Sequence, residues 1–177
     1  MIVAIIGQIG SGKTVLNDAL VRGFHRTHPT MEVVSVRQDD LGTQGKSLPG
    51  TRFYNGFEAL DYLEKERALN FVLSVSEGQD VFGSRADRYD PRGFDLIFKG
   101  RHIGASLIVD TQRASRVTTD LLSQAHEIFS FRQILPHDLE RVEEYAAWPE
   151  APDVVRTLPD HVFASLRHPG KLYRLQF

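Results

Sequence analysis

The sequence has no cysteine among its 177 residues. Disulfide bridges, cysteine-ligated zinc sites and thiol catalysis are therefore excluded, and the composition suits a reducing, cytoplasmic compartment. It also lacks a run of about 18 apolar residues, so no membrane-spanning helix is predicted. No basic segment precedes the apolar N-terminus, which argues against a signal peptide. The seven histidines are scattered without the spacing of metal ligands, so we predict no histidine metal centre.

An excess of one charge sign is missing as well. The chain has 21 Lys and Arg residues against 23 Asp and Glu residues, which gives a net charge of −2. A net charge this small does not by itself indicate a nucleic-acid partner. The hydrophobic content of 41% is ordinary for a globular protein, and 177 residues can bury one core. We therefore expect residues 1–177 to form a single domain.

Short apolar runs alternate with segments of helical spacing. The runs predicted as strands are Ile2–Ile6, Glu32–Val36, Asn70–Val75, Ala105–Val109 and His126–Phe131. The segments predicted as helices are Lys13–His28, Phe57–Ala68, Arg92–His102, Ser115–Ser123 (with Ser115 as its N-cap) and Pro136–Tyr145. Two polar segments, Gln38–Asn55 and Gly78–Pro91, are predicted as loops. This alternation predicts an α/β fold of three layers with a mostly parallel central sheet.

The last part of the chain has a different pattern. His161–Leu166 and Leu172–Phe177 are β-type runs on either side of the turn sequence Arg167–Gly170. Two such runs around a short turn predict a C-terminal β-hairpin.

The first predicted strand runs directly into GQIGSGKT. Gly7, Gly12, Lys13 and Thr14 meet the spacing G-x-x-x-x-G-K-[ST], between a strand and a helix as that motif requires. The glycines let successive backbone N–H groups turn toward phosphate oxygens, the lysine reaches the β- and γ-phosphates, and the threonine hydroxyl ligates Mg²⁺. The predicted nucleotide-binding residues are Gly7, Gln8, Ile9, Gly10, Ser11, Gly12, Lys13 and Thr14. The motif does not distinguish a kinase, a GTPase and a motor.

Glu77 follows the third predicted strand and is the predicted catalytic base. A carboxylate at such a strand end can polarise the water that attacks a γ-phosphate. Ser76 precedes it, where many ATPases have the aspartate that holds Mg²⁺ through its water shell. Asp110, at the end of the fourth predicted strand, is the alternative acid. Against it, Thr-Gln-Arg rather than an acid follows Asp110.

Gln112 also follows the fourth strand and is predicted to contact the γ-phosphate or the attacking water, because an amide can orient either without a change of charge. The segments GQIGSGKT, VLSVSEGQ and GRHIGASLIVDTQRAS, taken in order, resemble the FtsK/HerA-type branch of the additional-strand P-loop ATPases. The small size is similar to that of the genome-packaging ATPases of tailless internal-membrane phages and archaeal viruses. Thr111-Gln112-Arg113 is the most specific part of this resemblance.

The resemblance implies an Mg²⁺-dependent ATPase that forms a homo-oligomeric ring, commonly a hexamer, and moves double-stranded DNA into a preformed capsid. Contacts to DNA are then made to phosphates without sequence preference. Capsid vertex proteins are further implied partners, and the host cytoplasm or a virion vertex is the implied location. An arginine of one subunit is expected to reach the γ-phosphate bound by the next. Arg101 is the first candidate, and the other candidates are Arg85, Arg88 and Arg92.

Two other classes stay open at this point. A small nucleoside or nucleotide kinase fits the size and the loop, with Arg85–Arg92 as a lid over an acceptor. A filamentous-phage-type assembly ATPase resembles the same branch, although such proteins typically carry a membrane anchor. For DNA contact, Gln38–Asn55 offers Lys46, Arg52, Phe53 and Tyr54, either as a pore-facing loop or as a plain connector.

Overall fold

The computed structural model describes residues 1–37, 48–83 and 90–176. The strands are β1 (Ile2–Ile6), β2 (Glu32–Val36), β3 (Thr51–Phe53), β4 (Phe71–Val75), β5 (Ser106–Thr111), β6 (Glu127–Ser130), β7 (Val162–Ser165) and β8 (Leu172–Arg174). The α-helices are α1 (Lys13–Thr27), α2 (Gly56–Lys65), α3 (Gln79–Phe82), α4 (Pro91–Lys99), α5 (Thr119–Gln124), α6 (Pro136–Tyr145) and α7 (Ala151–Thr157). None of the helices in these ranges combines the length and the hydropathy that a bilayer-spanning helix requires.

The strands form one sheet in the order β3-β2-β4-β5-β1-β6-β7-β8. The pairs from β3 through to β6 are parallel, whereas β7 pairs antiparallel with β6 and with β8. The predicted mostly parallel sheet and C-terminal hairpin are therefore confirmed, and the hairpin extends the central sheet. β5 lies between β1 and β4, which is the additional-strand arrangement that was expected.

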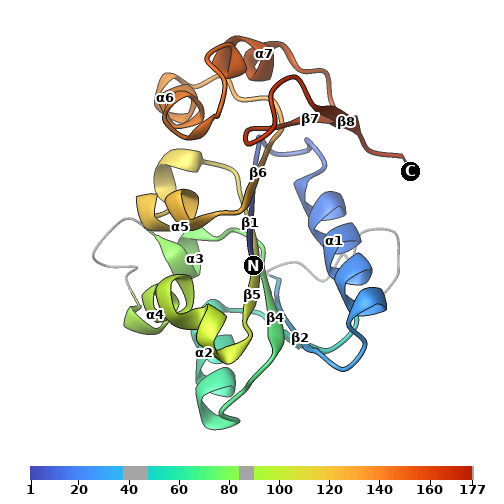
Figure 1. The fold of residues 1–177 in the computed structure, drawn as a ribbon, viewed down its shortest axis with the longest axis vertical. Coiled ribbons are helices and arrows are strands. Elements are labelled where there is room, and N and C mark those ends of the chain that lie inside the picture. Colours follow the sequence, from blue (N-terminus) through green and yellow to red (C-terminus); the bar gives the residue numbers. More distant parts are fainter. Residues whose placement is uncertain (38–47, 84–89, 177) are drawn as a thin grey trace.

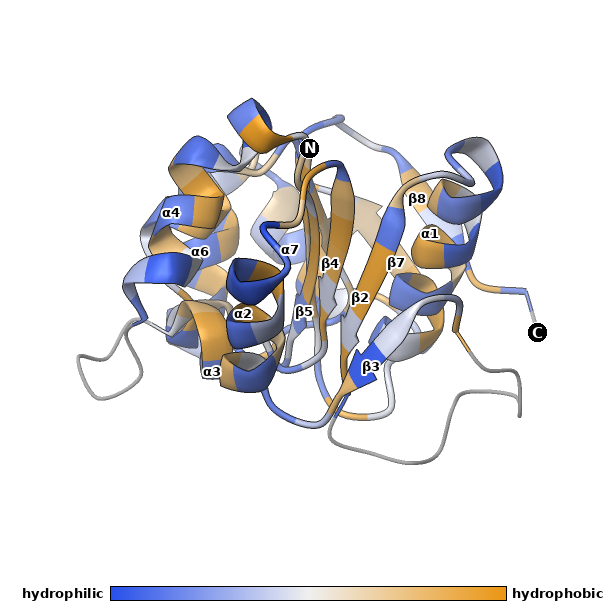
Figure 2. Cartoon of the chain, turned by 90° about the horizontal axis from the view of Figure 1, so that it is seen from below, coloured by the Kyte–Doolittle hydropathy of each residue, from blue (hydrophilic) through white to orange (hydrophobic). Residues whose placement is uncertain are grey.

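Helices cover both faces of this sheet, so the fold has the three predicted layers. α1 lies alone on one face near the hairpin, while α2, α3, α4 and α5 lie on the other (Figure 1). Within β1, Val3 and Ile5 pack toward α1, and Ile2, Ala4 and Ile6 pack into the larger core on the opposite side. The apolar strands between two helical layers are visible in Figure 2. Burial on both faces explains why β1 reads as a continuous apolar run.

Several local predictions are wrong. Ser115 does not cap a helix: it lies in a 3₁₀ turn, Ala114–Arg116, and both its backbone N–H and its hydroxyl donate to Asp138. α5 begins later, with the Thr118 hydroxyl accepting from the Asp120 N–H. Each predicted loop contains a short element, β3 in one and α3 in the other, and α7 was not predicted. Four-residue and three-residue elements carry too few periodic positions to be recognised in a sequence.

Candidate nucleotide site

The loop between β1 and α1 has the backbone that its glycines were predicted to allow. Gly10 and Gly12 have φ values of 77° and 103°, in the left-handed region that residues with a Cβ rarely adopt. A Cβ on Gly12 would also lie 2.5 Å from Leu175 Cδ1. The Gly7 N–H donates to the Thr111 carbonyl at 3.2 Å and so anchors the start of the loop to the end of β5.

The N-terminus of α1 keeps its positive character. Gly12 is the N-cap and supplies no side-chain cap hydrogen bond, and the first turn contains no acid. Unsatisfied N–H groups and the helix dipole make such an end a binding site for an anion.

Lys13 places a buried ammonium over this loop. It is 6% exposed, and its Nζ donates to the Gln8 carbonyl at 2.9 Å. Burial lowers the pKa of Lys13, and the charges of Asp110 and Glu77 partly oppose that shift. Ser11 Oγ is buried in the same loop without a hydrogen-bond partner in the part of the chain that the structure describes. A cation, free N–H groups and an orphaned hydroxyl together fit a polyphosphate.

Glu77 and Gln112 meet beside the loop, at the carboxyl ends of β4 and β5. Gln112 Nε2 donates to Glu77 Oε1 at 2.6 Å. The other carboxylate oxygen, Oε2, is buried and has no hydrogen-bond partner among the described residues. Glu77 also has a φ of 59°, and this left-handed backbone is unusual for a residue with a long side chain. The turn thus holds a half-satisfied carboxylate whose charge acts on Lys13 of the loop.

Asp110, the alternative acid, is buried at the end of β5 with 1% exposure. Asn17 Nδ2 donates to Asp110 Oδ2 at 2.7 Å, and the Ser76 hydroxyl donates to the same oxygen at 3.0 Å. Burial raises the pKa of Asp110, while the charges of Arg37 and Lys13 and these hydrogen bonds act in the opposite direction. The two acids therefore occupy different places: Glu77 pairs with Gln112, and Asp110 lies beneath α1.

A buried polar network behind the loop was missed by the sequence reasoning. Arg37, which follows β2, pairs with Asp18 at 2.9 Å and donates to Asn17 Oδ1 and to Ser74 Oγ. Ser74 also donates to Asn17 Oδ1 at 2.7 Å, which links β2, α1 and β4 to Asp110 on β5. The only signal in the sequence was the polar pair Asn17 and Asp18 within the apolar face of α1.

The structure separates the candidate arginines. Arg101 lies in the 3₁₀ turn Gly100–Ile103, exposed, before β5 and therefore at the edge of the sheet opposite to Gln112. Arg92 is bound within its own chain by Asp90 at 2.8 Å, by Glu64 at 3.4 Å and by Asp61. Arg85 and Arg88 lie outside the described residues. Arg101 is therefore exposed, whereas Arg92 is engaged by three acids of its own chain.

The residues present fit Mg²⁺ held mainly by a nucleotide. No cluster of three or more His, Asp or Glu that could cage a metal ion exists among residues 1–37, 48–83 and 90–176. Mg²⁺ usually binds to one or two protein groups together with phosphates and waters. Thr14, on the first turn of α1, is the candidate ligand. A carboxylate lies near the same helix, because Asp110 accepts a hydrogen bond from Asn17 on the next turn.

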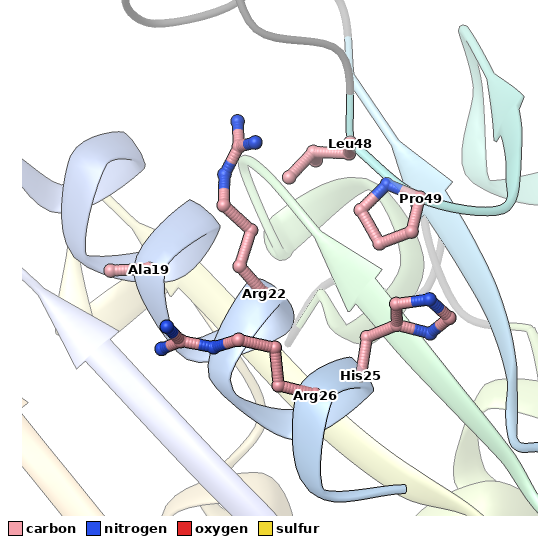
Figure 3. A pocket seen from close by; sticks show the side chains of 6 residues that line it. All are labelled: Ala19, Arg22, His25, Arg26, Leu48 and Pro49. Atoms are coloured by element: carbon pink, nitrogen blue, oxygen red, sulfur yellow. The ribbon is translucent and has the colours of Figure 1, made fainter. Parts of the chain in front are cut away.

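A separate hollow of about 580 Å³ lies between α1 and the segment that precedes β3. Successive turns of the helix contribute Arg22, His25 and Arg26, and the segment before β3 contributes Leu48 and Pro49 (Figure 3). Near it on β3, Arg52 stacks over the Tyr54 ring at 5.5 Å. Lys46, also considered for DNA contact, lies outside the described residues. This side of the molecule carries several cationic groups away from the loop.

No family model matches the chain, and no curated protein matches it. Among solved structures, it is similar to the genome packaging NTPase B204 from Sulfolobus turreted icosahedral virus 2, in complex with ATP-gammaS. The TM-score is 0.74 at 22% identity, over 93% of this chain and 90% of that one.

The N-terminal domain of zonular occludens toxin from Neisseria meningitidis gives a TM-score of 0.53 at 19% identity, over 75% of this chain and 77% of that one. The pCW3 conjugation coupling protein TcpA gives 0.62 at 15% identity, over 98% of this chain and 59% of that one. At these identities the likeness concerns the fold. The chain therefore has the predicted α/β P-loop NTPase fold, which it shares with the genome packaging NTPase named above.

Proposed function

We propose that the chain is an Mg²⁺-dependent ATPase that couples hydrolysis to the translocation of double-stranded DNA and packages viral DNA into a preformed capsid. One observation carries the ATPase part: Gln112 holds Glu77 at 2.6 Å beside the loop, with Glu77 Oε2 left unpartnered. The neighbour B204, named as a genome packaging NTPase, supports the packaging part.

In this function the loop binds ATP. Backbone N–H groups of the loop donate to phosphate oxygens, except that of Gly7, which donates to the Thr111 carbonyl. The Lys13 ammonium exchanges the Gln8 carbonyl for the β- and γ-phosphates. Thr14 ligates Mg²⁺, which neutralises charge on the phosphates when it is bound. Gly10 and Gly12 keep the loop in its left-handed turns, so that the N–H groups stay directed at the anion.

Hydrolysis then needs a positioned water. Glu77 Oε2 accepts a proton from the water while the water oxygen forms a bond to the γ-phosphorus. The bond between the γ-phosphorus and the β,γ-bridging oxygen breaks, which gives ADP and phosphate. Gln112 fixes the carboxylate through Oε1 and so leaves Oε2 for the water. Arg101 of a neighbouring subunit completes the site by stabilising transition-state charge.

DNA and ring assembly are the wider parts of the proposal. The side of α1 that carries the guanidinium groups of Arg22 and Arg26 suits contacts to DNA phosphates that do not depend on sequence. We propose residues 1–177 as one ATPase domain, six copies of which form the ring, with capsid vertex proteins as partners in the host cytoplasm or at the virion. Arg92, the described part of the kinase lid, is bound to three acids and does not favour that alternative.

The test is the ATPase rate with and without double-stranded DNA over a salt series. We expect DNA to stimulate hydrolysis. The apparent affinity for DNA, taken from the DNA concentration that gives half-maximal stimulation, should fall roughly 10³-fold or more between low and physiological salt. Lys13→Ala is the control that removes nucleotide binding and should show no rate under any condition. A DNA-independent rate would overturn the translocase. Transfer of phosphate to a nucleoside acceptor above the rate of release to water would favour a kinase.

A further inference from the structure

We propose that Asp110, on β5, is the positioning carboxylate for the water shell of Mg²⁺, in place of the aspartate that ATPases of this type usually carry at the end of β4. This inference rests on the ATPase function proposed above. At the β4 position the chain has Ser76, which cannot supply a negative charge. The strand register shows where that charge is found instead.

Ser76 and Asp110 are direct neighbours across two strands. Val75 pairs with Val109 in the parallel register of β4 and β5, so the next residues, Ser76 and Asp110, lie opposite each other. The Ser76 hydroxyl donates to Asp110 Oδ2 at 3.0 Å and to Oδ1 at 3.2 Å. The hydroxyl thus holds the carboxylate from the place where the usual aspartate would be. Compared with an ATPase that has an aspartate at the end of β4, the negative charge in this chain lies one strand nearer to β1 and the loop.

Asp110 also faces the first turns of α1. It pairs in register with Ile5, which packs against that helix, and it accepts from Asn17 at 2.7 Å. Thr14 and Asn17 are three residues apart on α1 and therefore share a face of the helix. The Asp110 charge further acts on Lys13. Asp110 is thus enclosed by the residues on which an Mg²⁺–nucleotide complex would be built.

The charge of Asp110 is only partly compensated within the chain. Its hydrogen bonds come from an amide and a hydroxyl, and the charges of Arg37 and Lys13 act on it without an ion pair to either of these described residues. The nearby Arg37 is instead paired with Asp18 at 2.9 Å. A buried carboxylate without an ion pair is costly and is retained where a cation compensates it. A hydrated Mg²⁺ on Thr14 supplies that cation.

The experiment measures ATPγS affinity, in excess EDTA and in saturating Mg²⁺, for purified full-length protein. The ratio of the two dissociation constants is the coupling between metal and nucleotide. In Asp110→Asn, which keeps the side-chain shape, we expect the affinity in Mg²⁺ to fall by about 10- to 100-fold, as for other groups that orient metal ligands. The affinity in EDTA should not fall.

A swapped variant makes the test specific. Ser76→Asp combined with Asp110→Ser returns the carboxylate to β4 and keeps both groups, so the coupling should recover most of its wild-type value. Asp90→Asn is the matched control, because it neutralises a buried acid that caps α4 and is paired with Arg92, outside the network of Asp110. Its coupling should equal that of the wild type.

The outcomes separate this inference from the proposed function. Wild-type protein that binds no ATPγS overturns the ATPase itself. If the wild type binds ATPγS and the coupling is unchanged in Asp110→Asn, only the role of Asp110 is overturned. A loss of ATPγS affinity that is equal in EDTA and in Mg²⁺ overturns it too, because it would mark a purely structural acid. If Asp110→Asn does not fold, the swapped variant decides: folded protein without metal coupling overturns the inference.

Discussion

At the scale of single residues, the proposed chemistry depends on side chains whose hydrogen bonds are incomplete. Most buried polar atoms in folded proteins have partners, yet Ser11 Oγ and Glu77 Oε2 have none in the described ranges. Both lie at the loop or beside it. Glu77 is moreover held in a left-handed backbone, a cost that the rest of the fold has to offset. Such unsatisfied and strained groups are expected where a ligand completes the site.

The first prediction concerns the charge of Glu77. Glu77→Gln should bind ATP with near wild-type affinity but lose turnover by roughly 10²-fold or more, because a positioned base contributes that much to proton transfer. Equilibrium binding of a fluorescent ATP analogue and steady-state phosphate release measure the two effects separately. Glu66→Gln, the same change at an exposed position after α2, is the control. Full activity in Glu77→Gln would assign the base to another carboxylate.

Residue spacing predicted only part of this site. The loop follows from a short motif, and Glu77 and Gln112 were placed at the ends of two strands, where the structure shows them in contact. Their catalytic roles stay predictions. Arg37 and Ser74 could not be found in this way, because single polar residues at strand ends have no characteristic spacing. Their importance appears only when the parallel register brings β2 and β4 under α1.

At the scale of elements, strands were predicted well and helix ends poorly. A fully buried parallel strand is a continuous apolar run, so each of the five predicted strands is found within about two residues of its predicted bounds. Helix ends depend on caps, and caps depend on single side chains. α4 begins at Pro91 rather than Arg92, with Asp90 as its N-cap, and it ends at Lys99 because a 3₁₀ turn follows.

The cap of α4 gives the second prediction. Asp90 accepts from the Arg92 backbone N–H and from the Arg92 guanidinium, and the guanidinium hydrogen bond is the main cause that lowers the pKa of Asp90. Asp90→Ala should lower the free energy of unfolding by about 1–2 kcal/mol, the usual effect of losing an N-cap. Asp90→Asn keeps the cap and loses only the charge, so it should cost less. Urea titration at pH 7 measures both.

The lowered pKa of Asp90 also predicts how the difference in stability between wild type and Asp90→Asn changes with pH. An acid whose pKa is lowered by folding stabilises the protein above the pKa of the unfolded chain, about 3.9 for Asp. The gap between wild type and Asp90→Asn should therefore be full at pH 7 and should close as the pH falls below about 4, through the lowered folded value. A gap that stayed constant down to pH 3 would show that the carboxylate charge contributes nothing.

At the scale of the whole molecule, the proposed nucleotide site lies at the carboxyl ends of the parallel strands, and Arg101 lies at their amino ends, just before β5. β5 runs from Ser106 to Thr111, about 20 Å at the usual rise per residue, and separates that arginine from Gln112. Within one subunit, Arg101 therefore cannot reach the loop. This geometry leaves two roles for it, a contact in trans or a solvated surface group. The sequence alone could not distinguish them, since it does not encode how copies of the chain pack.

The last prediction decides between these roles by mixing subunits. If Arg101 completes a neighbour's site, Arg101→Gln should lose about 10³-fold in turnover, in line with other arginines that act in trans, and still bind ATP. Lys13→Ala is equally inactive but keeps Arg101, so mixtures of the two variants should regain activity at contacts where an intact loop meets an intact arginine. Arg67→Gln, an exposed arginine after α2, should be fully active. The measurement is the ATPase rate at fixed total protein as the mixing ratio of the two variants varies. Mixtures that stay as inactive as their components would place Arg101 outside the site.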